Sequence, residues 1–202
     1  LLSREELLAG ENIDAAFFPH LELGDFPEAL RLSRRMPTVL LNRITDEPEL
    51  SYIAVDYVEG SCLIIRRFLE NGAQNIMLAD GTSQPELSYT RFSRELGYRK
   101  AYEQLGREVN EELILQYLRT EWYEAIAEKL IRFKPDVIFV SCEVVMPPVC
   151  SALKAHARSL GKKVHLFCFD DLQDFAMFDS GSVSYGRMPF RAMCCRAIEY
   201  LS

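Results

Sequence analysis

Several features that mark other protein classes are missing from this sequence. No apolar run reaches the ~18 residues that a membrane-spanning helix needs, and no charged-then-apolar leader with a small-residue cleavage site opens the chain. Lys and Arg number 23 against 30 Asp and Glu, which gives a formal net charge of −7. Binding to a phosphate backbone needs clustered basic residues, so this chain is not expected to grip nucleic acid itself, and we expect no membrane partner.

Metal and nucleotide sites are not indicated either. The chain has three histidines, and none of its six cysteines stands in a Cys-x-x-Cys pair, so zinc is not expected. Neither Gly-x-Gly-x-x-Gly nor Gly-x-x-x-x-Gly-Lys-[Ser/Thr] occurs, which leaves no glycine loop to cradle a phosphate. We therefore expect no cofactor. Most of the cysteines stand in apolar runs, as free thiols do, which favours a reducing, cytoplasmic setting.

Short apolar runs alternate with segments of helical periodicity, in a composition that is ordinary for a globular protein: 49% hydrophobic and 26% charged. The runs that predict buried parallel strands are 13–19, 37–44, 75–80, 136–141 and 163–170. Helices are predicted over 26–35, 58–71, 86–105, 121–133, 149–160 and 189–201. Repeated strand-then-helix units predict an α/β fold with doubly wound parallel sheets.

Polar residues follow the predicted strands. In open α/β sheets ligands bind beyond the carboxyl ends of the strands. The residues in question are mostly acidic: Asp56, Glu59, 80–83, 141–143 and 170–171. Many hydrogen-bond acceptors with few cations suit the hydroxyls of a sugar or polyol better than a phosphate.

Three side chains are singled out as ligand contacts, and each has a structural alternative. Asp170 ends an apolar strand and is able to accept two hydrogen bonds from vicinal hydroxyls, or to cap a helix. Arg94 offers a fork of N–H donors to a ligand, or lies exposed on its helix. Trp122 presents a face on which a sugar ring stacks, or packs in the core.

An enzymatic alternative rests on Cys142 or on paired carboxylates. A reactive cysteine needs a nearby base or cationic surroundings, whereas the neighbour of Cys142 is Glu143. His156 falls in a polar helical stretch and His165 interrupts a strand, so neither is a convincing base. The sequence therefore favours a protein that is not an enzyme. Cys194 and Cys195 are no better candidates, because the helix over 189–201 is expected to bury at least one of them.

Seven motifs occur together in a fixed order. They are Ile13–Phe18, Pro37–Arg43, Val55–Gly60, Leu69–Ile76, Arg94–Tyr98 (Arg-Glu-Leu-Gly-Tyr), Pro135–Ser141 and Phe169–Asp171 (Phe-Asp-Asp). In order and spacing they resemble the effector-binding domain of lactose-repressor/galactose-repressor (LacI/GalR) type transcription regulators. The chain is similar in the same way to the periplasmic sugar-binding proteins of that fold.

The resemblance implies a two-lobed, class I periplasmic-binding-protein-like fold, in which each lobe is a doubly wound parallel sheet flanked by helices. Residues 1–80 would form the N-terminal lobe, 81–184 the C-terminal lobe, and 185–202 would return to the first. It also implies ligand contacts from five residues: Arg94, Asp170, Trp122, Ser141 and Glu59. Three positions depart from the family pattern, with Tyr57 for a common Asn, Cys142 for an acceptor Asp and Cys168 for Gly.

The sequence thus predicts an effector-sensing domain that clamps a small carbohydrate between two lobes. The resemblance implies that closure of the two lobes around the ligand changes how strongly operator DNA is bound by a helix-turn-helix headpiece, which is absent from this chain. It also implies a cytoplasmic homodimer. The alternative is a periplasmic sugar-binding protein of a transporter, against which the unpaired cysteines speak.

Overall fold

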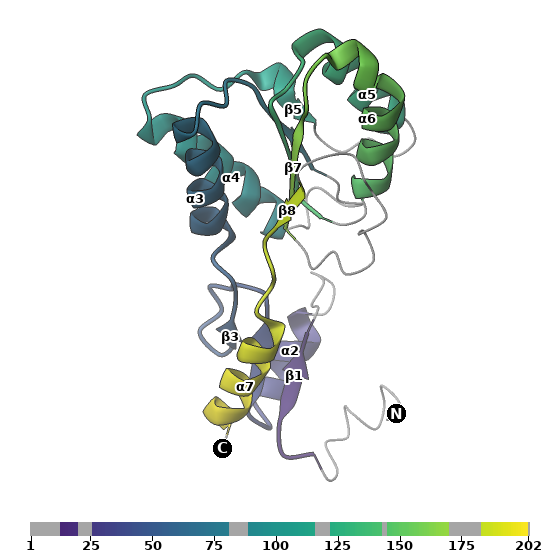
Figure 1. The fold of residues 1–202 in the computed structure, drawn as a ribbon. Helices are drawn as coiled ribbons and strands as arrows, with labels where there is room; N and C mark the ends of the chain where they lie inside the picture. Colours follow the sequence, from purple (N-terminus) through teal and green to yellow (C-terminus); the bar gives the residue numbers. More distant parts are fainter. Residues whose placement is uncertain are drawn as a thin grey trace. The chain divides into compact units, whose positions relative to one another are not determined.

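The computed structural model describes residues 13–19, 26–80, 89–115, 122–142, 145–169 and 183–201. Two compact units are present: Leu1–Val55 together with Pro189–Ser202, and Asp56–Met188 (Figure 1). We call them the small unit and the large unit and describe each by itself. The α/β class with parallel sheets flanked by helices is confirmed in both.

The described residues of the small unit form a three-stranded parallel sheet with one helix on each face. Its strands are β1 (Ala16–Phe18), β2 (Thr38–Leu41) and β3 (Ser51–Ile53), in the order β1-β2-β3. Successive side chains of a strand point to opposite faces. Leu40 therefore packs with α2 (Phe26–Ser33), while Val39 and Leu41 pack with α7 (Phe190–Leu201).

The large unit is built on a five-stranded parallel sheet in the order β5-β4-β6-β7-β8. The strands are β4 (Ile76–Ala79), β5 (Ile114–Leu115), β6 (Val137–Val140), β7 (His165–Cys168) and β8 (Val183–Tyr185). The helices are α3 (Tyr57–Glu70), α4 (Tyr89–Gln104), the short 3₁₀ helix η3 (Glu111–Leu113), α5 (Trp122–Phe133) and α6 (Met146–Leu160).

The alternation of side chains along these strands creates two separate cores. One set packs under α5 and α6: Met77, Ala79, Ile138, Val140, Leu166 and Cys168. The other set packs under α3 and α4: Ile76, Leu78, Val137, Phe139 and Phe167. Figure 1 shows α3 and α4 on one side of β7, and α5 and α6 on the other. Burial on both faces explains why the central strands are continuous apolar runs.

Helices α3 and α4 lie in very close contact. A Cβ atom added to Gly97 of α4 would stand 2.3 Å from the Val58 carbonyl oxygen and 2.6 Å from Cβ of Ser61, both on α3. At its amino end α3 is capped by Asp56, whose Oδ1 accepts a hydrogen bond from the Glu59 N–H at 2.8 Å. This cap satisfies one of the backbone N–H groups that the first turn of α3 would otherwise leave without a partner.

The division of the chain differs from the expected lobe ranges. A first lobe of 1–80 would include α3 and β4, but β4 pairs with β6 along its whole length and α3 packs on α4. Both elements belong to the large unit, which starts at Asp56 rather than at residue 81. The return to the small unit comes at Pro189 rather than at residue 185, because β8 (Val183–Tyr185) is still part of the larger sheet.

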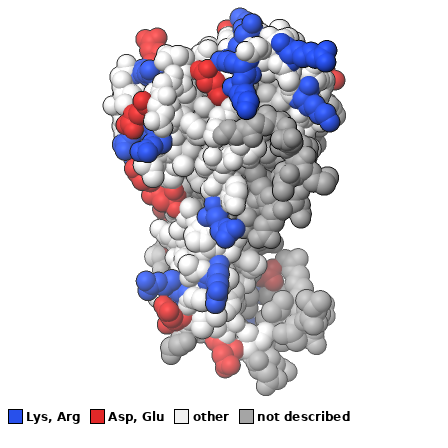
Figure 2. Space-filling view, in the orientation of Figure 1, with Lys and Arg blue, Asp and Glu red and all other residues white. Residues whose placement is uncertain are grey.

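The described residues contain no helix long and apolar enough to cross a membrane. Lys and Arg side chains occur at several separate places on the face drawn in Figure 2, with Asp and Glu among them.

Candidate functional site

The carboxyl edge of the five-stranded sheet brings together residues that are far apart in the sequence. Asp80 follows β4, Ser141 follows β6, and Phe169 follows β7, and all three are buried. Their positions are fixed by the parallel ladder: the N–H of Ser141 donates to the Ala79 carbonyl at 3.0 Å, and that of Phe169 donates to the Val140 carbonyl at 3.3 Å. This is the edge at which ligands bind in open α/β sheets.

Arg94 of α4 reaches this edge. Its side chain is buried, with 5% of the residue exposed. Cζ of its guanidinium lies 4.5 Å from the ring centre of Tyr57 and 5.5 Å from that of Phe169. Among the described residues no carboxylate forms an ion pair with it, and its Nε has no hydrogen-bond partner. A buried donor without a partner is costly, which is typical of a group that awaits a ligand.

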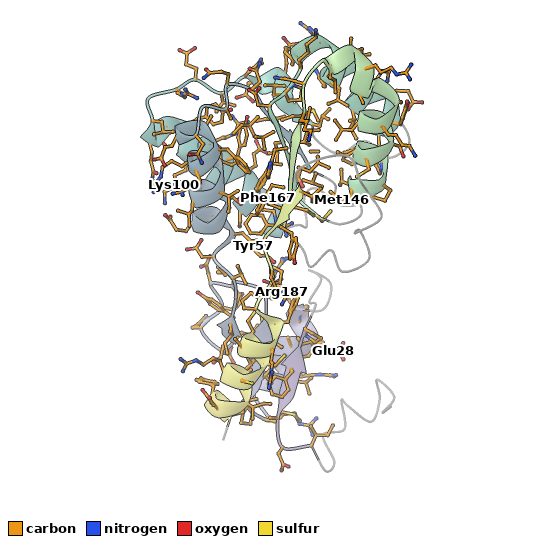
Figure 3. All side chains as sticks on the ribbon, viewed as in Figure 1. Glu28, Tyr57, Lys100, Met146, Phe167 and Arg187 are labelled. Carbon is orange, nitrogen blue, oxygen red and sulfur yellow. The ribbon has the colours of Figure 1, made fainter. Side chains whose placement is uncertain are left out.

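Aromatic rings surround this arginine and pack on one another. The Tyr57 and Phe169 rings are 6.0 Å apart in an edge-to-face arrangement. Phe169 makes further edge-to-face contacts with Phe139 and Phe167, while those two rings stack on each other at 5.5 Å. Tyr57 on α3 and Phe167 on β7 are labelled in Figure 3. The result is a rigid apolar wall beside a few polar groups, as in many small-molecule sites.

A sequence profile for the family described as "Periplasmic binding protein-like domain" matches residues 65–202. This match covers well over half of the chain. The chain belongs to the periplasmic-binding-protein-like domain family. No curated protein matches it significantly in sequence.

Solved structures share the fold of this periplasmic-binding-protein-like domain at low sequence identity. A sugar-binding transcriptional regulator of the LacI family from Escherichia coli, complexed with phosphate, has a TM-score of 0.78 and 21% identity over 98% of this chain and 72% of that one. A LacI-family regulatory protein from Chloroflexus aggregans has a TM-score of 0.78 and 18% identity, with 98% and 70% covered. The transcriptional regulator CelR in complex with cellobiose has a TM-score of 0.75 and 23% identity, with 96% and 60% covered.

These similarities confirm the predicted resemblance, because the family is periplasmic-binding-protein-like and the solved structures of similar fold include LacI-family regulators. At these identities the likeness to solved structures shows the fold of the chain and no more.

The other predicted contacts of this periplasmic-binding-protein-like domain differ from one another in burial and surroundings. Ser141 is fully buried at the carboxyl edge. Trp122 begins α5 and is partly buried against the core beneath α5 and α6, which is the packing role that the sequence left open. Glu59 is at the surface, with 59% of its side chain exposed, and forms an ion pair with Lys100 of α4 at 2.6 Å. Asp170 lies outside the described residues.

Arg94 is therefore the predicted residue that the structure brings together with the aromatic wall. The alternative of an exposed helix arginine is wrong, because its helix turns it inward. Two residues of the wall, Tyr57 and Phe169, were not predicted as site residues. The signal was present in both cases: Tyr57 follows the capping Asp56, and Phe169 is the aromatic residue of the Phe-Asp-Asp motif.

The cysteines have the character of packing residues in the large unit and of surface residues in the small one. Burial raises the pKa of Cys150 to about 11. The pKa of Cys62 is also raised, mainly by burial and in addition by the negative charge of Glu59. A raised thiol pKa disfavours the nucleophilic thiolate. On α7 both Cys194 and Cys195 are exposed, so the expectation that at least one is buried is wrong: α7 buries Met193 and Ala197 instead.

His165 is not placed to activate Cys142. His165 begins β7, at the amino edge of the sheet, where its Nε2 lies 3.0 Å from Oγ of Ser184 and burial lowers its pKa. Cys142 follows β6 at the opposite, carboxyl edge and packs against the core under α5 and α6. Among the described residues no group of three or more His, Cys, Asp or Glu is arranged to hold a metal ion.

Proposed function

We propose that this chain is the effector-binding domain of a LacI-type transcription regulator and that it binds a small carbohydrate or polyol at the carboxyl edge of its five-stranded sheet. The observation that carries the proposal is the guanidinium of Arg94. It is buried against two aromatic rings, and its Nε lacks a hydrogen-bond partner among the described residues.

The chemistry of this edge suits a hydroxyl-rich ligand. Arginine presents five N–H donors in a fixed plane, and the buried rings of Tyr57 and Phe169 surround its guanidinium with apolar surface. Asp80 and Ser141 supply oxygen atoms at the same edge. Asp170, Trp122 and Glu59 remain proposed contacts.

The regulatory part of the proposal follows from the relatives that share this fold. Ligand binding shifts the population of a sensor domain only by the difference in affinity for its two states. We propose that this shift is transmitted, in a homodimer, to operator DNA through a helix-turn-helix headpiece outside this chain. The protein would then have no enzymatic activity of its own.

A reducing compartment fits the cysteines. All six lie in the described residues and none of them is in a disulfide bond, whereas exported proteins commonly pair theirs. We therefore propose a cytoplasmic regulator in preference to a periplasmic binding protein.

Isothermal titration tests the binding function. Cellobiose, D-glucose, D-ribose and sorbitol are titrated into the wild-type chain, and at least one is expected to bind with a Kd in the micromolar range, about −8 kcal/mol. Arg94→Met is expected to abolish the heat. The matched control is Arg99→Met on the same helix. Arg99 forms ion pairs with Glu95 and Glu111, and its replacement is expected to change the Kd by less than about twofold. Equal binding by the wild type and Arg94→Met, or no binding of any of the four compounds, would contradict the proposal.

A further inference from the structure

The guanidinium of Arg94 makes its described contacts with aromatic faces rather than with acceptors. Its Cζ lies over the rings of Tyr57 and Phe169 at 4.5 and 5.5 Å. Such cation–π contacts hold a cation in place without using its N–H groups. The Nε donor remains without a partner among the described residues. The two rings therefore fix the position of the arginine and leave its Nε donor available.

Space for the Phe169 ring is provided by two glycines from different parts of the chain. A Cβ atom added to Gly60 of α3 would lie 3.3 Å from Cζ of Phe169, and one added to Gly186 would lie 3.2 Å from its Cδ1. Both distances are tighter than ordinary van der Waals contact. The Gly186 N–H also donates to the Cys168 carbonyl at 2.8 Å, which holds this glycine beside the end of β7.

Both rings lie close to the points where the chain enters and leaves the large unit. The unit begins at Asp56 and ends at Met188. Tyr57 directly follows the first of these points, and Gly186, against which Phe169 packs, stands just before the second. Arg94 thus contacts one ring near the start of the large unit, that of Tyr57, and one ring that packs near its end, that of Phe169. We call these two ends the connections of the large unit.

We propose that Tyr57 and Phe169 are positioning residues, which hold the guanidinium of Arg94 ready for a ligand and join it to both connections of the large unit. The proposal rests on the proposed ligand-binding function for its purpose, but the arrangement itself is measurable without any ligand.

The first experiment measures the arginine side chain directly. In ¹⁵N-labelled protein the Nε–H signal of Arg94, assigned by its loss in Arg94→Met, is expected to be shifted upfield by the two ring currents. The shift is expected to persist in Tyr57→Phe and to fall substantially in Tyr57→Leu. The control is Tyr102→Leu, which removes another buried tyrosine whose ring contacts Tyr98. An Arg94 signal that is unchanged in Tyr57→Leu would overturn the positioning role.

The second experiment measures the connection to the two ends of the unit. The Gly186 N–H bonds to Cys168, and the Gly60 N–H bonds to the Asp56 carbonyl at 3.0 Å. If Arg94 joins the two rings, Arg94→Met is expected to speed hydrogen exchange of both amides by about tenfold relative to wild type, a loss of protection within the range of local opening. Arg99→Met is expected to change neither. Acceleration at one amide only, or at neither, would overturn the joint role.

Titration of Tyr57→Leu with cellobiose and D-ribose separates this inference from the proposed function. A Kd raised about tenfold in Tyr57→Leu, but less than about twofold in Tyr57→Phe and Tyr102→Leu, supports both. A Tyr57-dependent Arg94 signal in a protein that binds neither sugar supports the positioning role and counts against the carbohydrate function. Equal weakening by Tyr57→Leu and Tyr102→Leu would show a merely structural effect and overturn the positioning role.

Discussion

The ammonium of Lys162 donates to Oδ1 of Asp136 at 2.5 Å, while Oδ2 of the same carboxylate accepts the backbone N–H groups of Gln74 and Asn75 at 2.8 and 3.0 Å. One aspartate at the start of β6 thereby ties the segment before β4 to the segment before β7. We call these three hydrogen bonds of Asp136 the staple; they hold the amino edge of the large sheet, opposite the candidate site.

Removal of this carboxylate is expected to weaken the large unit. Asp136→Ala leaves two backbone N–H groups without their acceptor, and the expected loss is about 1–3 kcal/mol of the free energy of unfolding. Urea unfolding followed by circular dichroism measures it. Glu128→Ala, at an exposed position of α5, is the control and is expected to change stability by less than about 0.5 kcal/mol. Equal urea midpoints of unfolding for the two variants would contradict a stabilising role of Asp136.

The same carboxylate predicts a pH dependence. Burial acts to raise the pKa of Asp136, but the hydrogen bonds from Lys162, Asn75 and Gln74 outweigh it and lower the pKa below its ordinary value of 3.8. A lowered folded-state pKa gives stability that is present above the ordinary value and is lost as the pH falls through the lower, folded-state value. The difference in unfolding free energy between wild type and Asp136→Ala is therefore expected to be constant from pH 7 to about 5 and to shrink below about 3.8. A difference that grows on acidification would contradict this assignment.

The close approach of α3 and α4 predicts a costly glycine substitution. In Gly97→Ala the new Cβ would stand 2.3 Å from a backbone oxygen, so one helix must move. Overpacking of this kind costs about 1–3 kcal/mol. Thermal unfolding measures the effect, and Ser151→Ala at an exposed position of α6 provides a control. A melting temperature for Gly97→Ala as high as that of the control would show that the two helices are further apart than described.

The burial of the cysteines predicts a pattern of chemical modification. Cys194 and Cys195 are exposed on α7, whereas Cys62, Cys150 and Cys168 are buried. Under native conditions iodoacetamide is expected to modify the first pair at least about tenfold faster than the other three, because access and thiolate fraction set the rate. Peptide mass spectrometry over time gives the rates. Rapid modification of Cys168 in folded protein would contradict its place in the core.

The sequence predicts the central elements of this fold well and its edges poorly. Strands β2, β4, β6 and β7 are fully or almost fully buried, which makes them the apolar runs that sequence patterns reveal. Strands β3, β5 and β8 were missed. They are two or three residues long and stand at sheet edges, where partial exposure leaves no continuous apolar run.

The candidate site was predicted in part. Arg94 was singled out as a donor with an exposed helix arginine as the alternative, and the family resemblance decided between them, since α4 is too polar for periodicity to show which arginine turns inward. The Tyr57 and Phe169 rings were not predicted because their contact depends on tertiary packing around Gly60 and Gly186. Glu59 was chosen by its place in the chain, but the turn of α3 directs it to Lys100 at the surface.

The most direct test of the account is a crystal structure of this chain grown with whichever of cellobiose, D-glucose, D-ribose or sorbitol binds with the lowest Kd. We predict electron density for that compound at the carboxyl edge of the five-stranded sheet, with an N–H of Arg94 donating to one of its oxygens at about 2.9 Å and the Tyr57 and Phe169 rings still in contact with the guanidinium. Density for the compound elsewhere on the protein, with Arg94 unchanged and unliganded, would contradict it.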